Sequence, residues 1–575
     1  MFDLLITGGD VIDGRGGPRR RADVGIVGDR ILAIGNLVNG GGAQAAATID
    51  AAGLAVTPGF IDVHTHLDAQ VFWDPDLSPS PLHGVTTVIG GNCGFTIAPL
   101  GDDPAHGDYL MRMLARVEGI PLETLQAGVP WSWRTTAEYF DAIDGNVAVN
   151  AGFKVGHSAL RRVVMGDDSV RRAGTAGELE AMKALLRDGL EAGALGFSSS
   201  WSRTHNDPMG NMVPSRCAER DELVGLCSVL ADFDGTSVEF IPALGPFEDW
   251  AVELMADMSA AARSPLNWNV MTVTARSMDM NRAKLAAGDY AAARGGKVVA
   301  LTVPQTLSLH LNFNSGFVLD ALPGWEQVML LPKDAKRRIL ADPAERRRLN
   351  ELAQGDHPLR SLAHWERKVV FHSPAPANQG CEGRTVGEIA AERGQDPWDA
   401  LCDMALADDL ETSFGNPAVP EPTADWEARV EIWRDPRAVI GASDAGAHLD
   451  LFLTANYATN MLNEAVVRRG LIPLEEAVHL LTEVQANLYG LIDRGVLAEG
   501  AYADVAVFDE AAVGSGPTTF RSDLPAGASR LYAEATGIEH VICNGTEIVR
   551  RGQFTGARPG TLLRAGTHTT GPSLD

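Results

Sequence analysis

Short apolar runs separated by glycine and aspartate turns fill the first part of the chain, residues 1–57. The same style returns near the C-terminus, at Ala503–Asp509 and His540–Val549. Runs this short, bounded by Gly and Asp, are typical of β-hairpins. Neither end carries enough strand to bury a core alone, so we expect the two ends to build one β-sandwich. Two independent β appendages are the alternative.

Between these ends, apolar strand-like runs alternate with helical patterns, which is typical of parallel βα units. Ala176–Ala192, rich in Glu, Leu, Lys and Ala, is one predicted helix. Strands and helices in this order predict a closed (β/α)8 barrel of the α/β class, with its site at the C-terminal ends of the strands. The predicted strands are Gly59–Val63, Val85–Ile89, Val147–Val155, Leu195–Ser198, Ser237–Ile241, Leu266–Met271, Val298–Leu301 and Val439–Gly441.

This pattern divides the chain into an N-terminal part of the sandwich (1–57), a barrel (58–490) and a C-terminal part of the sandwich with a tail (491–575). Two long insertions interrupt the barrel, at about 98–145 and 303–430. Insertions on the catalytic face commonly shape the substrate pocket. Within the second, Asp334–Gln354 is dense in Arg, Glu and Leu and is most simply one solvated helix.

Composition narrows the class of partner. The chain has 575 residues, 45% of them hydrophobic, and a formal net charge of −27. So acidic a balance argues against nucleic acid or anionic membrane as a partner, and a substrate carboxylate would need a local Arg or Lys. The six cysteines form no close pairs, the N-terminus is acidic, and no long apolar run occurs. These features predict a cytoplasmic protein.

The first predicted barrel strand ends in a His-x-His motif, formed by His64 and His66. Side chains alternate along a strand, so the two imidazoles share one face and suit a divalent metal. A thiolate and a carboxylate from later strands, Cys93 and Asp444, would complete the set of ligands. The alternatives are core histidines, a buried hydrophobic cysteine and an aspartate that caps a helix.

Several longer motifs resemble the amidohydrolase superfamily, in particular its N-acyl-D-amino-acid deacylase (D-aminoacylase) branch. They are Gly59–His66, Gly84–Val88, Gly91–Gly94, Val155–Arg161, Gly193–Ser198, Gly500–Val505 and Val541–Gly545. The resemblance spans nearly the whole chain. It implies a metal-loaded barrel that hydrolyses an acyclic amide, such as an N-acyl-amino acid or a small acylated peptide. It also implies the metal ligands His64, His66, Cys93 and Asp444, with Asp444 as general acid and base.

The chain departs from this family at two positions, where the strand-five and strand-six histidines are missing. Glu239 stands on strand five, and Asn267 and Asn269 stand on strand six. Amide oxygens are weak ligands for zinc, so we expect one divalent ion, most simply zinc, unless Glu239 joins as a ligand. A buried Glu–Arg pair is the structural alternative for Glu239. Lys154, on strand three, is not expected to bridge metals, because this branch uses cysteine in that role.

Candidates for substrate binding follow the strands as mouth residues. They are His157, Ser200, Arg203 and His448, with Ser199, His205 and Asp450 beside them. Arg203 has the two-pronged geometry that suits a substrate carboxylate, and a solvent-facing arginine is its alternative. His157 is equally consistent with a satisfied core histidine.

Three functions remain open at this point. The first is a metal-dependent hydrolase of acyclic amides, with a small-molecule substrate and self-association as the expected partners. The second is a hydrolase of cyclic amides or other carboxamides in the same superfamily, because a fold does not fix a function. The third is a catalytically dead barrel that acts as a binding protein. A cysteine hydrolase built on Cys93 would need a nearby base.

Overall fold

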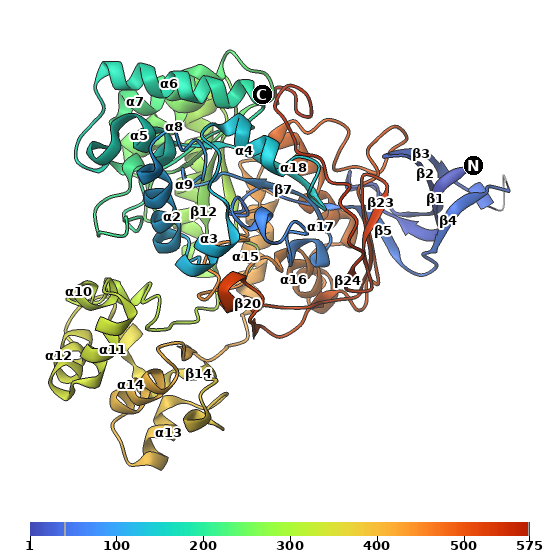
Figure 1. The fold of residues 1–575 in the computed structure, drawn as a ribbon. Helices are drawn as coiled ribbons and strands as arrows, with labels where there is room; N and C mark the ends of the chain where they lie inside the picture. Colours follow the sequence, from blue (N-terminus) through green and yellow to red (C-terminus); the bar gives the residue numbers. More distant parts are fainter. Residues whose placement is uncertain (39–41, 573, 575) are drawn as a thin grey trace.

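A parallel β-barrel forms the centre of the computed structural model, which describes residues 1–38, 42–572 and 574 (Figure 1). Parallel pairing runs from β6 through β7 to β8, and from β9 through β10, β11, β12 and β13 to β16. The strands are β6 (Phe60–Asp62), β7 (Val85–Gly90), β8 (Asn150–Phe153), β9 (Val155–Gly156), β10 (Gly196–Ser200), β11 (Ser237–Ile241), β12 (Leu266–Met271), β13 (Val298–Thr302) and β16 (Ala438–Ile440). Only Lys154 separates β8 from β9, so these two make one barrel position.

The barrel closes between the segments that follow β6 and β16. Thr65 pairs with Ala445 in a parallel bridge, and the backbone N–H of His66 donates to the carbonyl of Ala445 at 2.7 Å. The predicted eight-stranded barrel is therefore confirmed, and its closing seam lies beside the His-x-His motif.

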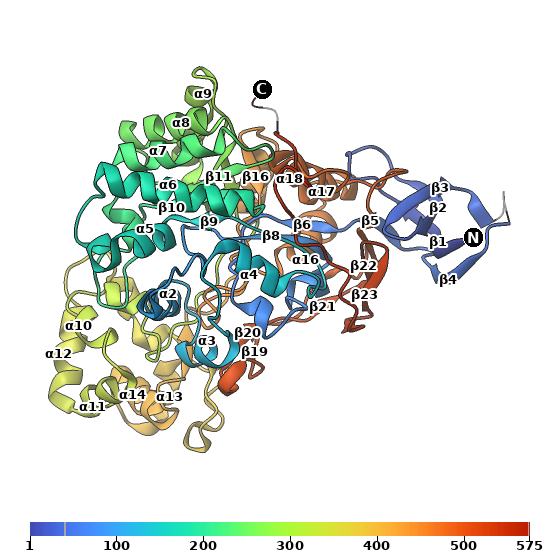
Figure 2. The ribbon, with the colours of Figure 1, turned by 45° about the horizontal axis from the view of Figure 1, so that its top comes forward.

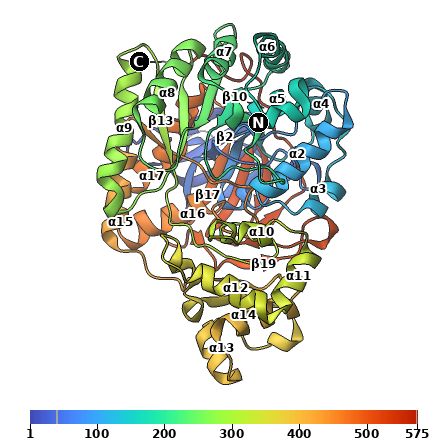
Figure 3. The same ribbon diagram turned by 90° about the vertical axis from the view of Figure 1, so that its left-hand side faces the viewer.

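Helices cover the outside of the barrel, and Figure 3 shows α5 to α9 side by side around it. The helix predicted at Ala176 is confirmed as α6, which begins with a capping box between Thr175 and Glu178. Among the described residues, none of the helices is both long and apolar enough to cross a bilayer. The covering helices are α5 (His157–Met165), α6 (Ala176–Glu191), α7 (Arg220–Leu230), α8 (Asp249–Ala262), α9 (Met278–Ala292), α15 (Thr423–Trp433), α16 (Tyr457–Met461), α17 (Leu474–Leu481) and α18 (Glu483–Tyr489).

Strands from both ends of the chain form one nine-stranded sheet beside the barrel (Figures 1 and 2). β17 pairs antiparallel with β5, so the alternative of two independent β appendages is wrong. A separate apolar core, which includes Val24, Val56 and Ile542, packs within this domain. The strands are β1 (Phe2–Val11), β2 (Arg20–Val27), β3 (Arg30–Gly35), β4 (Ala45–Asp50), β5 (Ala55–Pro58), β17 (Val505–Phe508), β22 (Ile538–Cys543), β23 (Thr546–Arg550) and β24 (Gln553–Phe554).

The two insertions pack differently. The first carries α2 (Pro104–Val117), α3 (Leu122–Gly128) and α4 (Thr136–Ile143). Its apolar side chains, such as Leu114 and Val117, belong to the same core as the barrel. This packing holds the end of α2 against the catalytic face.

The second insertion is a lobe with its own core, drawn in yellow in Figure 1. Trp325, Trp365 and Trp398 meet there, with ring centroids 5.0–5.8 Å apart. Leu451 and Phe452, from the loop after strand eight, join the same core and tie the lobe to the catalytic face. The elements of the lobe are α10 (Glu326–Met329), α11 (Lys333–Ala341), α12 (Pro343–Ala353), β14 (Val369–His372), α13 (Val386–Arg393), α14 (Pro397–Ala407) and β15 (Ser413–Gly415).

The single solvated helix predicted for Asp334–Gln354 is wrong, because this stretch forms α11 and α12. Asp342 separates them, and its side chain accepts from the backbone N–H of Ala344 as an N-cap. Pro343 then occupies the first turn, where a missing N–H costs nothing. Arg346, predicted to be solvated, is buried and donates to Asp403 at 2.7 Å.

Candidate metal centre

Two imidazoles converge where the first strand leaves the barrel. The chain stays extended beyond β6, so His64 and His66 point to the same side, with ring centroids 5.2 Å apart. Both side chains are buried, at 1% and 3% exposure. Two histidines held this close in the interior need a partner for their nitrogens.

The thiol of Cys93 reaches the same point. Its Sγ lies 3.6 Å from Nε2 of His64 and 3.8 Å from Nε2 of His66. The three potential ligand atoms all lie within 4.8 Å of one another. Thiolate and imidazole are the donors that zinc prefers, so this set fits a divalent ion of that type.

A tight turn after β7 brings Cys93 there. Gly91 has φ +72°, and a Cβ at this position would come 2.5 Å from the carbonyl oxygen of Lys154. Cys93 itself adopts φ +57°, which is uncommon for a residue with a side chain. Its backbone N–H donates to Oε2 of Glu239 at 2.7 Å, which fixes the turn.

Asp444 completes the cluster from strand eight. Oδ1 lies 3.0 Å from Nε2 of His64 and 3.7 Å from Nε2 of His66. Its side chain is 24% exposed, so the carboxylate is the open side of an otherwise buried cluster. Burial opposes ionisation of Asp444, but the two histidines hold its pKa well below the usual value.

Glu239 and the strand-six amides lie behind this cluster. Glu239 Oε1 is 3.9 Å from Nδ1 of His64, and both of its oxygens accept protein hydrogen bonds, from Cys93 and from Asn269. The Asn269 Nδ2 also lies 2.8 Å from Nδ1 of His64. Asn267 accepts from the hydroxyl of Tyr489 at 3.0 Å. Glu239 and Asn269 therefore contact the back of His64 and each other, whereas Asn267 bonds to Tyr489.

Carboxylates crowd this interior. Burial raises the pKa of Asp62, Glu118 and Glu239 to about 7 and that of Asp68 to about 6. Lys154 is the buried lysine among them and donates to Oδ1 of Asn92 at 2.7 Å. So many acidic groups in a low-dielectric site favour a bound cation, because buried charges need compensation.

The residues predicted to bind substrate lie in different environments. His157 has both ring nitrogens engaged, with Ser199 and with Glu222, each at 2.8 Å. Neither nitrogen is left for a substrate carbonyl. Ser200 is buried and bonds to Nδ1 of His205 at 2.8 Å.

Arg203 and His448 lie farther out. Arg203 is exposed. His448 is half-buried, and its ring lies against Phe452 and Phe317 at 4.8 and 5.4 Å. Of these two, His448 is the one packed into the mouth of the barrel.

Glu118, at the end of α2 in the first insertion, is a site residue that the sequence did not reveal. Its Oε1 lies 3.4 Å from Nδ1 of His66, and its side chain is 3% exposed. No motif marks it, and a Glu after a helical run is usually solvated.

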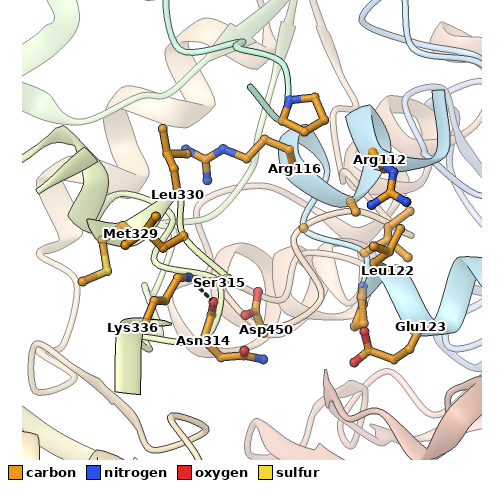
Figure 4. A pocket seen from close by; sticks show the side chains of 16 residues that line it. Arg112, Arg116, Leu122, Glu123, Asn314, Ser315, Met329, Leu330, Lys336 and Asp450 are labelled. Atoms are coloured by element: carbon orange, nitrogen blue, oxygen red, sulfur yellow. Dashed lines mark hydrogen bonds between the residues drawn. The ribbon is translucent and has the colours of Figure 1, made fainter. Parts of the chain in front are cut away.

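A cavity of about 310 Å³ lies beside the C-terminal end of α2, between α2 and the lobe (Figure 4). Gly119 and Asp450 line it, and the N–H of His448 donates to the carbonyl of Glu118 on the other side. Lys336, beside Asn314 and Asp450 in Figure 4, is 4% exposed and donates to the carbonyls of Phe313 and Asn314 at 3.3 and 2.6 Å. In the described part of the chain, no carboxylate forms an ion pair with it. Arg112 and Arg116 add two more basic side chains to the lining.

The sequence matches the model of the "Amidohydrolase family" over residues 47–549. The chain belongs to this family. Within it, the chain is 30% identical to D-aminoacylase of Alcaligenes xylosoxydans xylosoxydans over 568 residues, which cover 98% of this chain and 97% of the relative. It is 31% identical to N-acyl-D-glutamate deacylase of the same organism over 582 residues, 98% and 96% of the two chains.

A solved relative gives the same result in three dimensions. The crystal structure of N-acyl-D-glutamate deacylase from Bordetella bronchiseptica, complexed with zinc and a phosphonate inhibitor that mimics the tetrahedral intermediate, superposes with a TM-score of 0.64. The match covers 98% of this amidohydrolase and all of that chain, at 27% identity. The resemblance predicted from the motifs is therefore confirmed along the full length.

Proposed function

We propose that this amidohydrolase removes the acyl group from N-acyl-amino acids, using one divalent ion, most simply zinc. The observation that carries the proposal is the convergence of His64, His66, Cys93 and Asp444 at one point of the barrel mouth. The named activities of the relatives, which act on N-acyl-D-amino acids, support the substrate class.

One ion fits better than two. His64, His66 and Asp444 would hold it, with Cys93 as a further donor. A second ion would need ligands at Glu239 and strand six, but the oxygens of Glu239 already accept from Cys93 and Asn269. Asn269 and Asn267 offer only amides, which zinc binds weakly.

Asp444 is the residue best placed to move protons. When bound, the ion polarises the substrate carbonyl and acidifies water, whose pKa falls to about 7 at a catalytic zinc. The Asp444 side chain is 24% exposed, so it can reach an attacking water on the open side of the cluster. Its carboxylate accepts the proton of the attacking water and then delivers it to the leaving nitrogen. Because the cluster is buried on its other sides, water can attack the substrate carbonyl only from the side that Asp444 faces.

The cavity beside Glu118 supports a substrate that carries a carboxylate. The net charge of the protein is −27, so an anionic substrate needs a local cation. Lys336 meets that need, because it is buried and bonded to carbonyls alone. Arg116 lies in the same lining, although it is paired with Asp320. This cavity is a better candidate than the exposed Arg203.

Six free cysteines and the absence of disulfides within the described residues support a reducing compartment, such as the cytoplasm. Self-association of the barrel remains part of the proposal.

The test is a substrate screen with zinc-loaded protein of measured metal content. N-acyl-D-amino acids, their L-enantiomers, hydantoins and lactams are offered at equal concentration. Hydrolysis of N-acyl-amino acids supports the proposal. Turnover of the hydantoins and lactams alone would indicate a cyclic-amide hydrolase instead. A metal content near zero, with no turnover of any substrate, would indicate a catalytically dead barrel.

A further inference from the structure

Glu118 is a buried acid without an obvious purpose. It follows α2 as its C-cap residue, and its carbonyl oxygen accepts from the N–H of His448. Its side chain is 3% exposed, and among the described residues its ion-pairing partner is His66. Burying a carboxylate is costly, so a position that keeps one needs a compensating role.

His66 has a buried ring nitrogen that needs a hydrogen-bond partner. Its Nε2 faces Cys93 and Asp444, the direction in which a metal would be held. Its Nδ1 is buried and has no hydrogen-bond partner in the described part of the chain. An imidazole that ligates through Nε2 carries its proton on Nδ1, and that proton needs an acceptor.

Glu118 Oε1, 3.4 Å from Nδ1 of His66, is the acceptor within reach. Asp68 also faces His66 electrostatically, but its Oδ2 already accepts from the N–H of Gly91 at 3.2 Å. The back of His64 meets an amide instead, that of Asn269. The two histidines therefore differ in what lies behind them.

We infer that Glu118 is a positioning residue for His66, which fixes the orientation and the Nδ1–H tautomer in which His66 binds the metal. The inference rests on the proposed metal site. Glu118 touches neither substrate nor ion, so it acts through His66. Because it belongs to the first insertion, metal affinity depends on the docking of α2 as well as on the barrel.

The experiment measures zinc affinity of the full-length protein by competition with a chromophoric chelator. Glu118→Ala removes the acceptor, and Glu118→Gln keeps a neutral acceptor of the same length. Loss of such an outer partner typically weakens metal binding about 10–100-fold. We expect a loss in that range for Glu118→Ala and a smaller loss for Glu118→Gln. Glu123→Gln, a carboxylate of the adjoining cavity that forms no ion pair with any described residue, is the matched control and should stay within about twofold.

A spectroscopic readout separates positioning from general damage. In zinc-loaded protein with ¹⁵N-labelled histidine, the His66 Nδ1–H should give an exchange-protected resonance, assigned by its loss in His66→Ala. We expect that signal to shift in Glu118→Gln and to disappear in Glu118→Ala, while circular dichroism of the metal-free proteins stays unchanged.

Parent-like affinity and an unchanged Nδ1–H signal in both variants would overturn the inference and leave the proposed function standing. If Glu118→Ala fails to fold, Glu118→Gln decides by the same two readouts. A parent protein that binds no zinc would overturn the inference and the proposed metal site together.

Discussion

Nε2 of His64 lies 3.0 Å from Oδ1 of Asp444, although the two residues come from the first and the last strands of the barrel. The imidazole is buried and the carboxylate is 24% exposed. The acid therefore faces the entrance, whereas the imidazole faces the interior. This pair defines where substrate and metal would meet.

Removing the metal should abolish hydrolysis without unfolding the barrel. The cores of the barrel, the lobe and the β domain are large and apolar, and of the four donors only Cys93 belongs to one of them. We expect activity to return on addition of about one equivalent of zinc, because a catalytic site needs three protein ligands and an open position. Elemental analysis and circular dichroism check this. Full activity in protein shown to be metal-free, or a requirement for two ions, would contradict it.

Replacing Asp444 with Asn should remove proton transfer while keeping the side-chain shape. General acid–base groups contribute about 10²–10⁴-fold, and we expect kcat to fall in that range. The measurement is steady-state kinetics at saturating zinc, with metal content determined in parallel. Asp493→Asn, whose side chain is 52% exposed, is the control. A kcat within a factor of about three of the parent would exclude Asp444 from proton transfer.

Lys336→Met should raise KM for N-acyl-amino acids more than for the matching N-acyl amines, which lack the carboxylate. A hydrogen bond to a charged group is worth about 1.5–3 kcal/mol, or roughly 10–100-fold. Lys336→Arg should recover part of the effect because it keeps the charge. Lys333→Met is the control, because Lys333 lies three residues before Lys336 but is paired with Asp409 and Glu411. Equal losses on both substrates would mean that Lys336 only supports the lobe.

The ionisation of Glu222 should make the free energy of unfolding depend on pH in the acidic range. Burial alone would raise its pKa, but His157 and Arg161 lower it to about 2 from 4.5. A carboxylate with a lowered pKa stabilises the fold above its unfolded pKa, and this contribution is lost as pH falls toward the folded value. Glu222→Gln leaves Arg161 buried without its partner, so we expect a loss of about 3–5 kcal/mol at pH 7. In urea unfolding, that gap should narrow below about pH 4.5. The exposed Glu180→Gln is the control, and a gap independent of pH would contradict the assignment.

The barrel was predictable because its strands are short apolar runs and helical patterns follow most of them along the chain. His64 and His66 were predictable for a related reason: strand parity fixes which side chains share a face. The residues around them were not. Glu239 was found by its place on strand five, but only the structure shows that Cys93 and Asn269 occupy its oxygens.

The positions of Glu118 and Lys336 could not be predicted from the sequence. Both belong to insertions, whose paths are set by packing and not by the repeat of the barrel. The prediction that His157 contacts substrate rested on its position at the barrel mouth. It is not supported, because Ser199 and Glu222 occupy both ring nitrogens. Partners of this kind come from distant helices, and a pattern along one strand cannot report them.

The seam between Thr65 and Ala445 joins the beginning of the barrel to its last strand, so it can form only when both are present. Both histidines leave the ribosome early, but the strand that carries Asp444 emerges only after both insertions have been made. A nascent or truncated chain that stops before this strand holds three of the four proposed ligands on an open sheet, with unpaired edges at both ends. Such a chain would lack both the closing seam of the barrel and the carboxylate that the proposed proton transfer needs.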